Sequence, residues 1–183
     1  GELPEAKRTR FQEEFGLTAY DSEVLTSTRE LSLWFEEAAS ASQSAKRTAN
    51  LIISELLAVL NEKKQTIVDV EITPKHIAEL ADALEGNKIT SKQGKEVFAT
   101  MLETKQFPSD IIKEKGMEQV SDLGLIEKIV DQVLQENQKA VEDLKNGKTN
   151  VLGWLMGQVM KLSQGKANPK EASAILNKKL AEM

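Results

Sequence analysis

The sequence has 183 residues, and its hydrophobic content of 40% is enough for the core of one ordinary domain or of two small ones. Aromatic residues make up only 4% and charged residues 29%, a balance that favours packed amphipathic helices over sheets. The lack of cysteine and the single histidine exclude a disulfide framework, a thiolate nucleophile and metal sites built on cysteines or on a histidine pair.

Apolar residues recur at helical spacing through most of the chain, so we expect an all-α protein. A first helix should run over residues 4–15 and end at Gly16, and Asp21 should cap a short helix after it. Ser27 and Glu30 form a capping-box pattern, which predicts the start of a further helix.

The middle of the chain continues this pattern with one interruption. A long helical segment is expected over 44–63. Residues 65–72 alternate and are β-branched but have no second strand to pair with, so we expect an extended linker there. Threonine caps then predict helices over 73–86 and 90–102, and a short helix should occupy 109–116.

A domain boundary is predicted between residues 114 and 120, where charged residues, a C-cap glycine and the N-cap Ser121 follow one another. We therefore expect two consecutive helical domains, at 1–115 and 116–183. The second should be a small helical bundle with helices over 122–136, 138–146, 150–164 and 169–181, the last opened by Asn168 and Pro169.

Charge is distributed unevenly along the chain. Residues 1–144 carry 17 basic and 27 acidic side chains, a balance of −10. Residues 145–183 carry seven lysines and two glutamates, a balance of +5. This asymmetry predicts an anionic partner for the C-terminal end.

The helix expected at 150–164 combines a strongly apolar stretch with neighbouring lysines. Gly153 and Gly157 lie one turn apart on a face of their own. Close packing of another helix is the simpler explanation for them, and close approach of a ligand backbone is the alternative. The core face of the helix should consist of Val151, Leu152, Leu155, Met156, Val159 and Leu162.

Trp154, Gln158 and Lys161 form a third stripe on this helix, and their chemistry suits nucleic acid. A lysine contacts phosphate, an amide reads hydrogen-bonding edges, and an indole offers a stacking face. The alternative is a solvated helix edge with a half-buried tryptophan. The candidate RNA-binding residues, with the polar residues that flank the helix, are Lys145, Lys148, Trp154, Gln158, Lys161, Lys166, Asn168 and Lys170.

Several motifs, taken in order, resemble one known family. The tail motif is carried by Gly-Lys at 147–148, GWLMGQVMK at 153–161 and GKANP at 165–169. It is similar to that of GatB, the B subunit of the tRNA-dependent amidotransferase. Upstream, LPEAKR at 3–8 resembles the segment that leaves the family's catalytic cradle, and ITP at 72–74 resembles its helical middle domain. The resemblance covers effectively the whole chain.

The resemblance implies a function in preparing aminoacyl-tRNA. GatB works with the amidase (A) and small (C) subunits of that enzyme to amidate Glu-tRNA(Gln) or Asp-tRNA(Asn), using ATP, magnesium and ammonia drawn from glutamine. Its cradle carries the ATP and metal site, whereas its helical domain and its YqeY-like tail bind tRNA. Only these latter parts match, so we expect a C-terminal piece of a longer chain, with tRNA as partner and with no catalytic residue, metal site or cofactor of its own.

Other chemistries find little support. His76 is expected to be a surface or cap histidine, and adjacent carboxylates such as Glu36 and Glu37 should diverge into solvated faces. Residues 147–149 read Gly-Lys-Thr but lack the upstream glycine of a phosphate loop. With no membrane span or signal peptide in the sequence, we expect a cytoplasmic protein with neither membrane nor DNA as partner. The remaining alternative is a helical protein-interaction module that binds no RNA.

Overall fold

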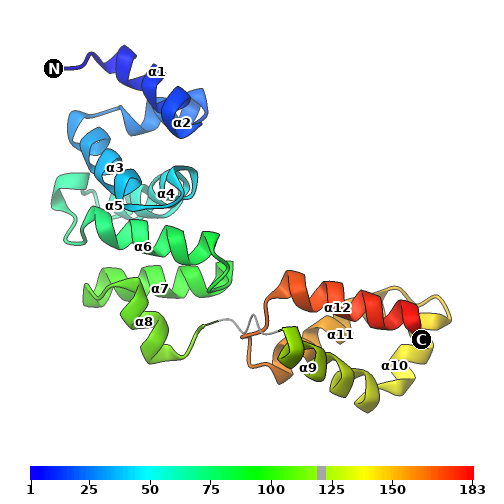
Figure 1. Ribbon diagram of the computed structural model, residues 1–183. Helices are drawn as coiled ribbons and strands as arrows, with labels where there is room; N and C mark the ends of the chain where they lie inside the picture. Colours follow the sequence, from blue (N-terminus) through cyan, green and yellow to red (C-terminus); the bar gives the residue numbers. More distant parts are fainter. Residues whose placement is uncertain (119–122) are drawn as a thin grey trace. The chain divides into compact units, whose positions relative to one another are not determined.

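The computed structural model describes residues 1–118 and 123–183, and these residues form helices and no β-strand (Figure 1). The expectation of an all-α protein is therefore confirmed. The chain divides into two compact units, Gly1–Lys115 and Gly116–Met183, each with its own buried core. The expected N-cap Ser121 lies outside the described residues. Over the described ranges, no helix has the length and apolar character needed to cross a bilayer.

Unit 1 is a succession of helices in which each packs mainly on its near neighbours. α3 packs on α4 and α6, and α7 packs on α6 and α8. The elements in chain order are α1 (Pro4–Phe15), α2 (Ala19–Leu25), α3 (Arg29–Ala41), α4 (Ala45–Leu51), the π-helical turn η1 (Ile52–Leu56), α5 (Leu57–Glu62), the 3-10 turn η2 (Ile67–Asp69), α6 (Pro74–Glu85), α7 (Ser91–Thr104) and α8 (Pro108–Lys115).

Two of the expected N-caps are wrong, and the hydrogen bonds show why. Thr18 caps α2, because its hydroxyl accepts a hydrogen bond from the Asp21 amide at 3.0 Å. Asp21 therefore lies in the first turn, where its charge favours the helix dipole. Thr28, one residue beyond Ser27, caps α3. Ser27 still belongs to the end of the preceding helix, because its amide donates to the Val24 carbonyl.

The segment expected over 44–63 is helical but changes its winding. α4 passes into the π-helical turn η1 and then into α5. A π turn holds more residues per turn than an α-helix and so rotates the residues that follow. Ile52, Leu56 and Leu60 follow one another at about one-turn spacing along this segment, and all three lie in the core, at 4% exposure or less.

The linker expected over 65–72 is extended only in part. Its centre forms η2, and Thr66 and Asp69 close this short turn with a capping box. Ile67 and Ile72 are buried and anchor the segment in the core of unit 1. The linker is therefore an ordered part of the unit, although it forms no strand.

His76 is a cap histidine, as expected, but it does not lie on the surface: only 5% of it is exposed. Its Nδ1 atom accepts a hydrogen bond from the Thr73 amide at 3.0 Å, which closes the first turn of α6. Because that amide is a donor, Nδ1 is unprotonated, and Nε2 carries the proton that it donates to the Lys105 carbonyl at 3.0 Å. The ring also stacks on Phe107. The expected capping box of Thr90 and Gln93 at α7 is confirmed.

Unit 2 is a small bundle in which α9, α11 and α12 pack on one another and α10 packs on α9 and α11. The helices are α9 (Leu123–Glu136), α10 (Gln138–Lys145), α11 (Asn150–Leu162) and α12 (Pro169–Glu182), close to the expected ranges. Asn168 caps α12 and Pro169 opens it, as expected. The buried core consists of Ile126, Val130, Val133, Leu134, Val141, Leu155, Val159, Ala167, Ala172 and Leu176.

Candidate nucleic-acid interface

The interface is built on α11, which buries one face in the bundle and exposes the other. Leu155 and Val159 are fully buried. Leu162 was expected in the same core face, but 41% of it is exposed. It lies only about 20° around the helix from Leu155 but is the last residue of α11, so its exposure goes with its position at the end of the helix and not with its angle. The remaining residues expected in this face are partly buried against the core: Val151, Leu152 and Met156.

Gly153 and Gly157 lie on the outward face, and the expected packing of another helix against them is not found among the described residues. Both residues are exposed, and a methyl group built on either α-carbon would have no described atom within 4 Å. The two glycines form a strip without side chains, which we call the glycine strip. The alternative explanation, close approach of a ligand backbone, therefore remains as a hypothesis.

Trp154 stands beside the glycine strip and is 48% exposed. Its side chain lines a groove of about 440 Å³ between α11 and the corner where α9 meets α10. We call this the Trp154 groove. Its polar lining includes Gln138, Lys139 and Asn150. Sequence reasoning missed these three residues, because no local pattern shows that the α9–α10 corner folds back beside the tryptophan.

Three lysines stand where α11 turns into α12: Lys161 in the last turn of α11, Lys166 in the connection and Lys170 in the first turn of α12. We call residues 161–170 the lysine turn. Its backbone is braced from inside. The Ser163 hydroxyl donates to the Met160 carbonyl at 3.1 Å and accepts from the Ala167 amide at 3.3 Å. Gln164 and Gly165 both adopt positive φ angles, of 57° and 75°, which makes the reversal tight. These hydrogen bonds hold the backbone that carries the lysines without help from a ligand.

The lysines of the lysine turn differ from other cations of unit 2 in their partners. Lys179 is paired with Glu127 and Asp131, and hydrogen bonds to these carboxylates raise its pKa. Among the described residues, no carboxylate lies within ion-pair distance of Lys161, Lys166 or Lys170. Their positive charge is therefore available to an external anion.

The other predicted site residues are less well placed for such contacts. Lys148 is exposed but lies 3.5 Å from the Asp143 carboxylate, and the Lys145 amine donates to the Met183 carbonyl at 3.1 Å. Asn168 is 8% exposed, and its side-chain oxygen accepts from the first amides of α12. Gln158 is partly buried beside Trp154 on α11. Of the predicted residues, Lys161, Lys166 and Lys170 thus lie on the lysine turn, Trp154 and Gln158 lie together on α11, and Asn168 is a helix cap.

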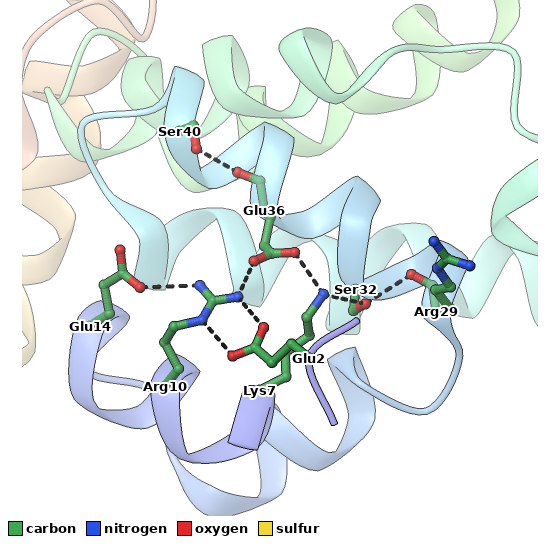
Figure 2. Close-up of polar contacts among 8 residues, drawn as sticks. All are labelled: Glu2, Lys7, Arg10, Glu14, Arg29, Ser32, Glu36 and Ser40. Atoms are coloured by element: carbon green, nitrogen blue, oxygen red, sulfur yellow. Dashed lines mark hydrogen bonds and ion pairs between the residues drawn. The ribbon is translucent and has the colours of Figure 1, made fainter. Parts of the chain in front are cut away.

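A polar network in unit 1 joins α1 to α3 (Figure 2). Glu36 was expected on a solvated face, but its carboxylate accepts hydrogen bonds from Arg10 and from Lys7, the latter at 2.9 Å. Arg10 also holds Glu2 through two hydrogen bonds, of 2.7 and 2.9 Å, and Glu14 at 3.1 Å.

The two cations of this network are fully paired with its three carboxylates. Hydrogen bonds to Glu2 and Glu36 raise the pKa of Arg10 further above its usual value. Partial burial opposes the ionisation of Glu36, but the hydrogen bonds from Arg10 and Lys7 outweigh it and lower the pKa of the carboxyl. We therefore assign the network to the structure of unit 1 and not to a ligand site.

Comparison with known proteins gives a consistent result along the chain. Residues 33–180 match the family model GatB_Yqey, described as a GatB domain. The B subunit of aspartyl/glutamyl-tRNA(Asn/Gln) amidotransferase from Treponema denticola is 58% identical over 182 residues. The proteins of the same name from Treponema pallidum and Carboxydothermus hydrogenoformans are 48% and 45% identical. Each match covers 100% of this chain but only 36% to 38% of the relative.

Proposed function

The chain belongs to the GatB_Yqey family, and we propose that it is the tRNA-binding C-terminal part of the B subunit of an ATP-dependent Glu-tRNA(Gln)/Asp-tRNA(Asn) amidotransferase. Unit 1 is then the helical middle domain and unit 2 the YqeY-like tail. The chain positions misacylated tRNA for transamidation during translation in the cytoplasm. Its protein partners are the amidase (A) and small (C) subunits of the enzyme.

ATP and magnesium belong, in this proposal, to the part of the B subunit that this chain does not span. Among the described residues, no group of acidic or histidine side chains lies close enough together to hold a metal ion. The sequence also has no phosphate loop. The contribution that we propose for this span is to bind and orient tRNA.

The observation that carries the proposal is the lysine turn. Three cations stand on a braced reversal without a carboxylate partner among the described residues, in a C-terminal region with a balance of +5. Contacts from lysine to phosphate are independent of base sequence and fix the register of an RNA. A rigid turn of this kind suits the backbone of a folded tRNA.

A second candidate function is a helical protein-interaction module. It is favoured by three leucines of unit 2 that lie at the surface, with exposures of 57%, 44% and 41%: Leu123, Leu125 and Leu162. Such a module would bind an acidic protein and show no preference for folded RNA. The two candidates therefore differ in how they respond to tRNA.

Fluorescence anisotropy with labelled tRNA and with an unrelated RNA duplex of equal charge tests the proposal. Replacing Lys161, Lys166 and Lys170 together by alanine should weaken tRNA binding about ten-fold or more at ~0.1 M salt. The slope of log affinity against log salt should fall by about one unit per lost contact.

A matched control replaces three exposed lysines of unit 1, Lys63, Lys88 and Lys92, by alanine and so makes the same change in net charge. This control should retain most of the affinity. The proposal of tRNA binding is wrong if the lysine-turn variant binds tRNA as tightly as the parent, or if the parent does not prefer tRNA to the duplex. The protein-interaction module is then the better explanation.

A further inference from the structure

The Trp154 groove is formed by polar side chains around one aromatic wall. Gln138 and Asn150 open the first turns of α10 and α11, and both line the groove together with the indole of Trp154. The volume of about 440 Å³ lies within the range of pockets that hold small organic groups. The groove can therefore accept a flat group with hydrogen-bonding edges.

The charges of the groove argue against a phosphate inside it. Two carboxylates, Glu136 and Asp143, belong to its lining. Asp143 is paired with Lys148 at 3.5 Å, and Glu136 accepts a hydrogen bond from Gln132 at 2.9 Å. The lining holds these two carboxylates against one lysine, Lys139, so a phosphate would enter a negative balance of charge, whereas a neutral heterocycle would not be repelled and could use the amides and the indole. The groove and the lysine turn thus have different chemical preferences.

We propose that the Trp154 groove receives one unpaired nucleobase of the bound RNA, stacked on the indole, while the lysine turn holds neighbouring phosphates. This inference rests on the proposed function and adds a site for a base to it. A base within a duplex offers only its edges, because its faces are covered by the adjacent pairs. Only an unpaired base can place its face on Trp154 and its edge against Gln138 and Asn150.

The glycine strip supports this arrangement without being a site itself. Gly153 and Gly157 leave the surface beside Trp154 without side chains, and no described atom covers it. A ribose-phosphate backbone can therefore run close to α11, from the groove toward Lys161 in the last turn of the helix. This path connects the Trp154 groove with the lysine turn along the outward face of α11.

The test uses the full 183-residue chain with tryptophan 34 replaced (Trp34→Phe), so that Trp154 is the only indole. Two RNA duplexes serve as probes, one with a single bulged adenosine and one fully paired. The bulged duplex should quench the emission of Trp154, and the paired duplex should leave it nearly unchanged. Trp154→Ala should weaken binding of the bulged duplex about 5-fold to 100-fold and leave the paired duplex and the salt slope unaffected.

Two further variants keep the test independent of folding. Trp154→Phe retains a smaller stacking face and should recover part of the affinity for the bulged duplex. Leu33→Ala removes an exposed apolar side chain of unit 1 that belongs neither to the groove nor to the lysine turn, and it should have no effect.

The base site would be wrong if Trp154→Ala lost the same affinity for both duplexes, or if the bulged duplex did not quench the emission of Trp154. If the lysine-turn variant still loses tRNA affinity in that case, the proposed function stands and only the base site is wrong. If neither the lysines nor the tryptophan affects RNA binding, both proposals fall together.

Discussion

At the scale of single residues, His76 links two helix ends. Its Nδ1 atom caps α6 through Thr73, and its Nε2 atom bonds the Lys105 carbonyl just after α7. The ring also stacks on Phe107, with ring centroids 3.9 Å apart, and this contact helps to fix its orientation. A neutral imidazole is suited to this position because it accepts at one nitrogen and donates at the other.

We expect His76→Ala to destabilise unit 1 by about 1 to 3 kcal/mol, because it removes a cap, a buried side chain and the donor to the partly buried Lys105 carbonyl. Denaturant unfolding followed through the emission of Trp34 in α3 measures the loss, in a Trp154→Phe background. The neighbouring Lys75→Ala, at an exposed position, is the control and should change little. An unchanged midpoint for His76→Ala would show that the histidine only fills space.

At the scale of helices, α11 illustrates a conflict between stability and binding. Exposed glycines in the middle of a helix cost stability, because glycine loses more backbone entropy on folding than alanine does. Gly153 and Gly157 have no packing partner among the described residues that would justify this cost. We therefore connect their presence with the access of a ligand backbone.

Gly157→Ala tests this connection. The open space around the α-carbon admits a methyl group, so the variant should be more stable by about 0.5 to 1 kcal/mol. It should at the same time bind tRNA more weakly, because the methyl group would stand in the path of the backbone. Thermal unfolding and anisotropy on the same sample measure both effects. If the variant gains stability and keeps its full affinity for tRNA, the glycine strip has no role in tRNA binding.

The contact between α1 and α3 should depend on pH through Glu36. The pKa of this carboxyl is lower in the folded protein than its usual value of 4.5, so between the two values the unfolded chain binds more protons. Stability is therefore fully present above pH 4.5 and is lost as the pH falls through the lowered value. Thermal unfolding between pH 7 and pH 2 should show this loss.

Glu36→Gln should lower the unfolding temperature at pH 7 and reduce its dependence on pH below 4.5, because the glutamine cannot carry the charge that Lys7 and Arg10 bind. The exposed neighbour Glu37 offers the matched control, Glu37→Gln. A pH profile of Glu36→Gln that follows the parent would assign the acid sensitivity to other carboxylates.

At the scale of the whole molecule, the two units have separate cores, and we expect them to unfold separately. Leu155 is fully buried in unit 2, so Leu155→Ala should destabilise that unit by about 2 to 5 kcal/mol and leave unit 1 unchanged. Trp34 reports on unit 1 and Trp154 on unit 2, each in a background where the other is phenylalanine. The half-exposed Leu162→Ala should cost much less. A single transition shared by both reporters would contradict this expectation.

The sequence by itself determined the helices of both units and several of their ends. The caps at Thr90 and Asn168 could be predicted because a cap and its partner amide lie within three residues of each other. The lysines of the C-terminal region could also be named from the sequence, because the balance of charge is counted directly along the chain. Where two hydroxyl residues compete, as Ser27 and Thr28 do, local pattern did not decide between them.

Only the tertiary structure decided which side chains meet and which stay open. Residues far away in the sequence bury His76 and supply the cation partners of Glu36. The surface at Gly157 is open because no described residue packs against it. The Trp154 groove likewise exists only because the α9–α10 corner folds against α11. Periodicity shows that a helix has an outward face, but the packing of distant elements decides whether that face is covered or available to a ligand.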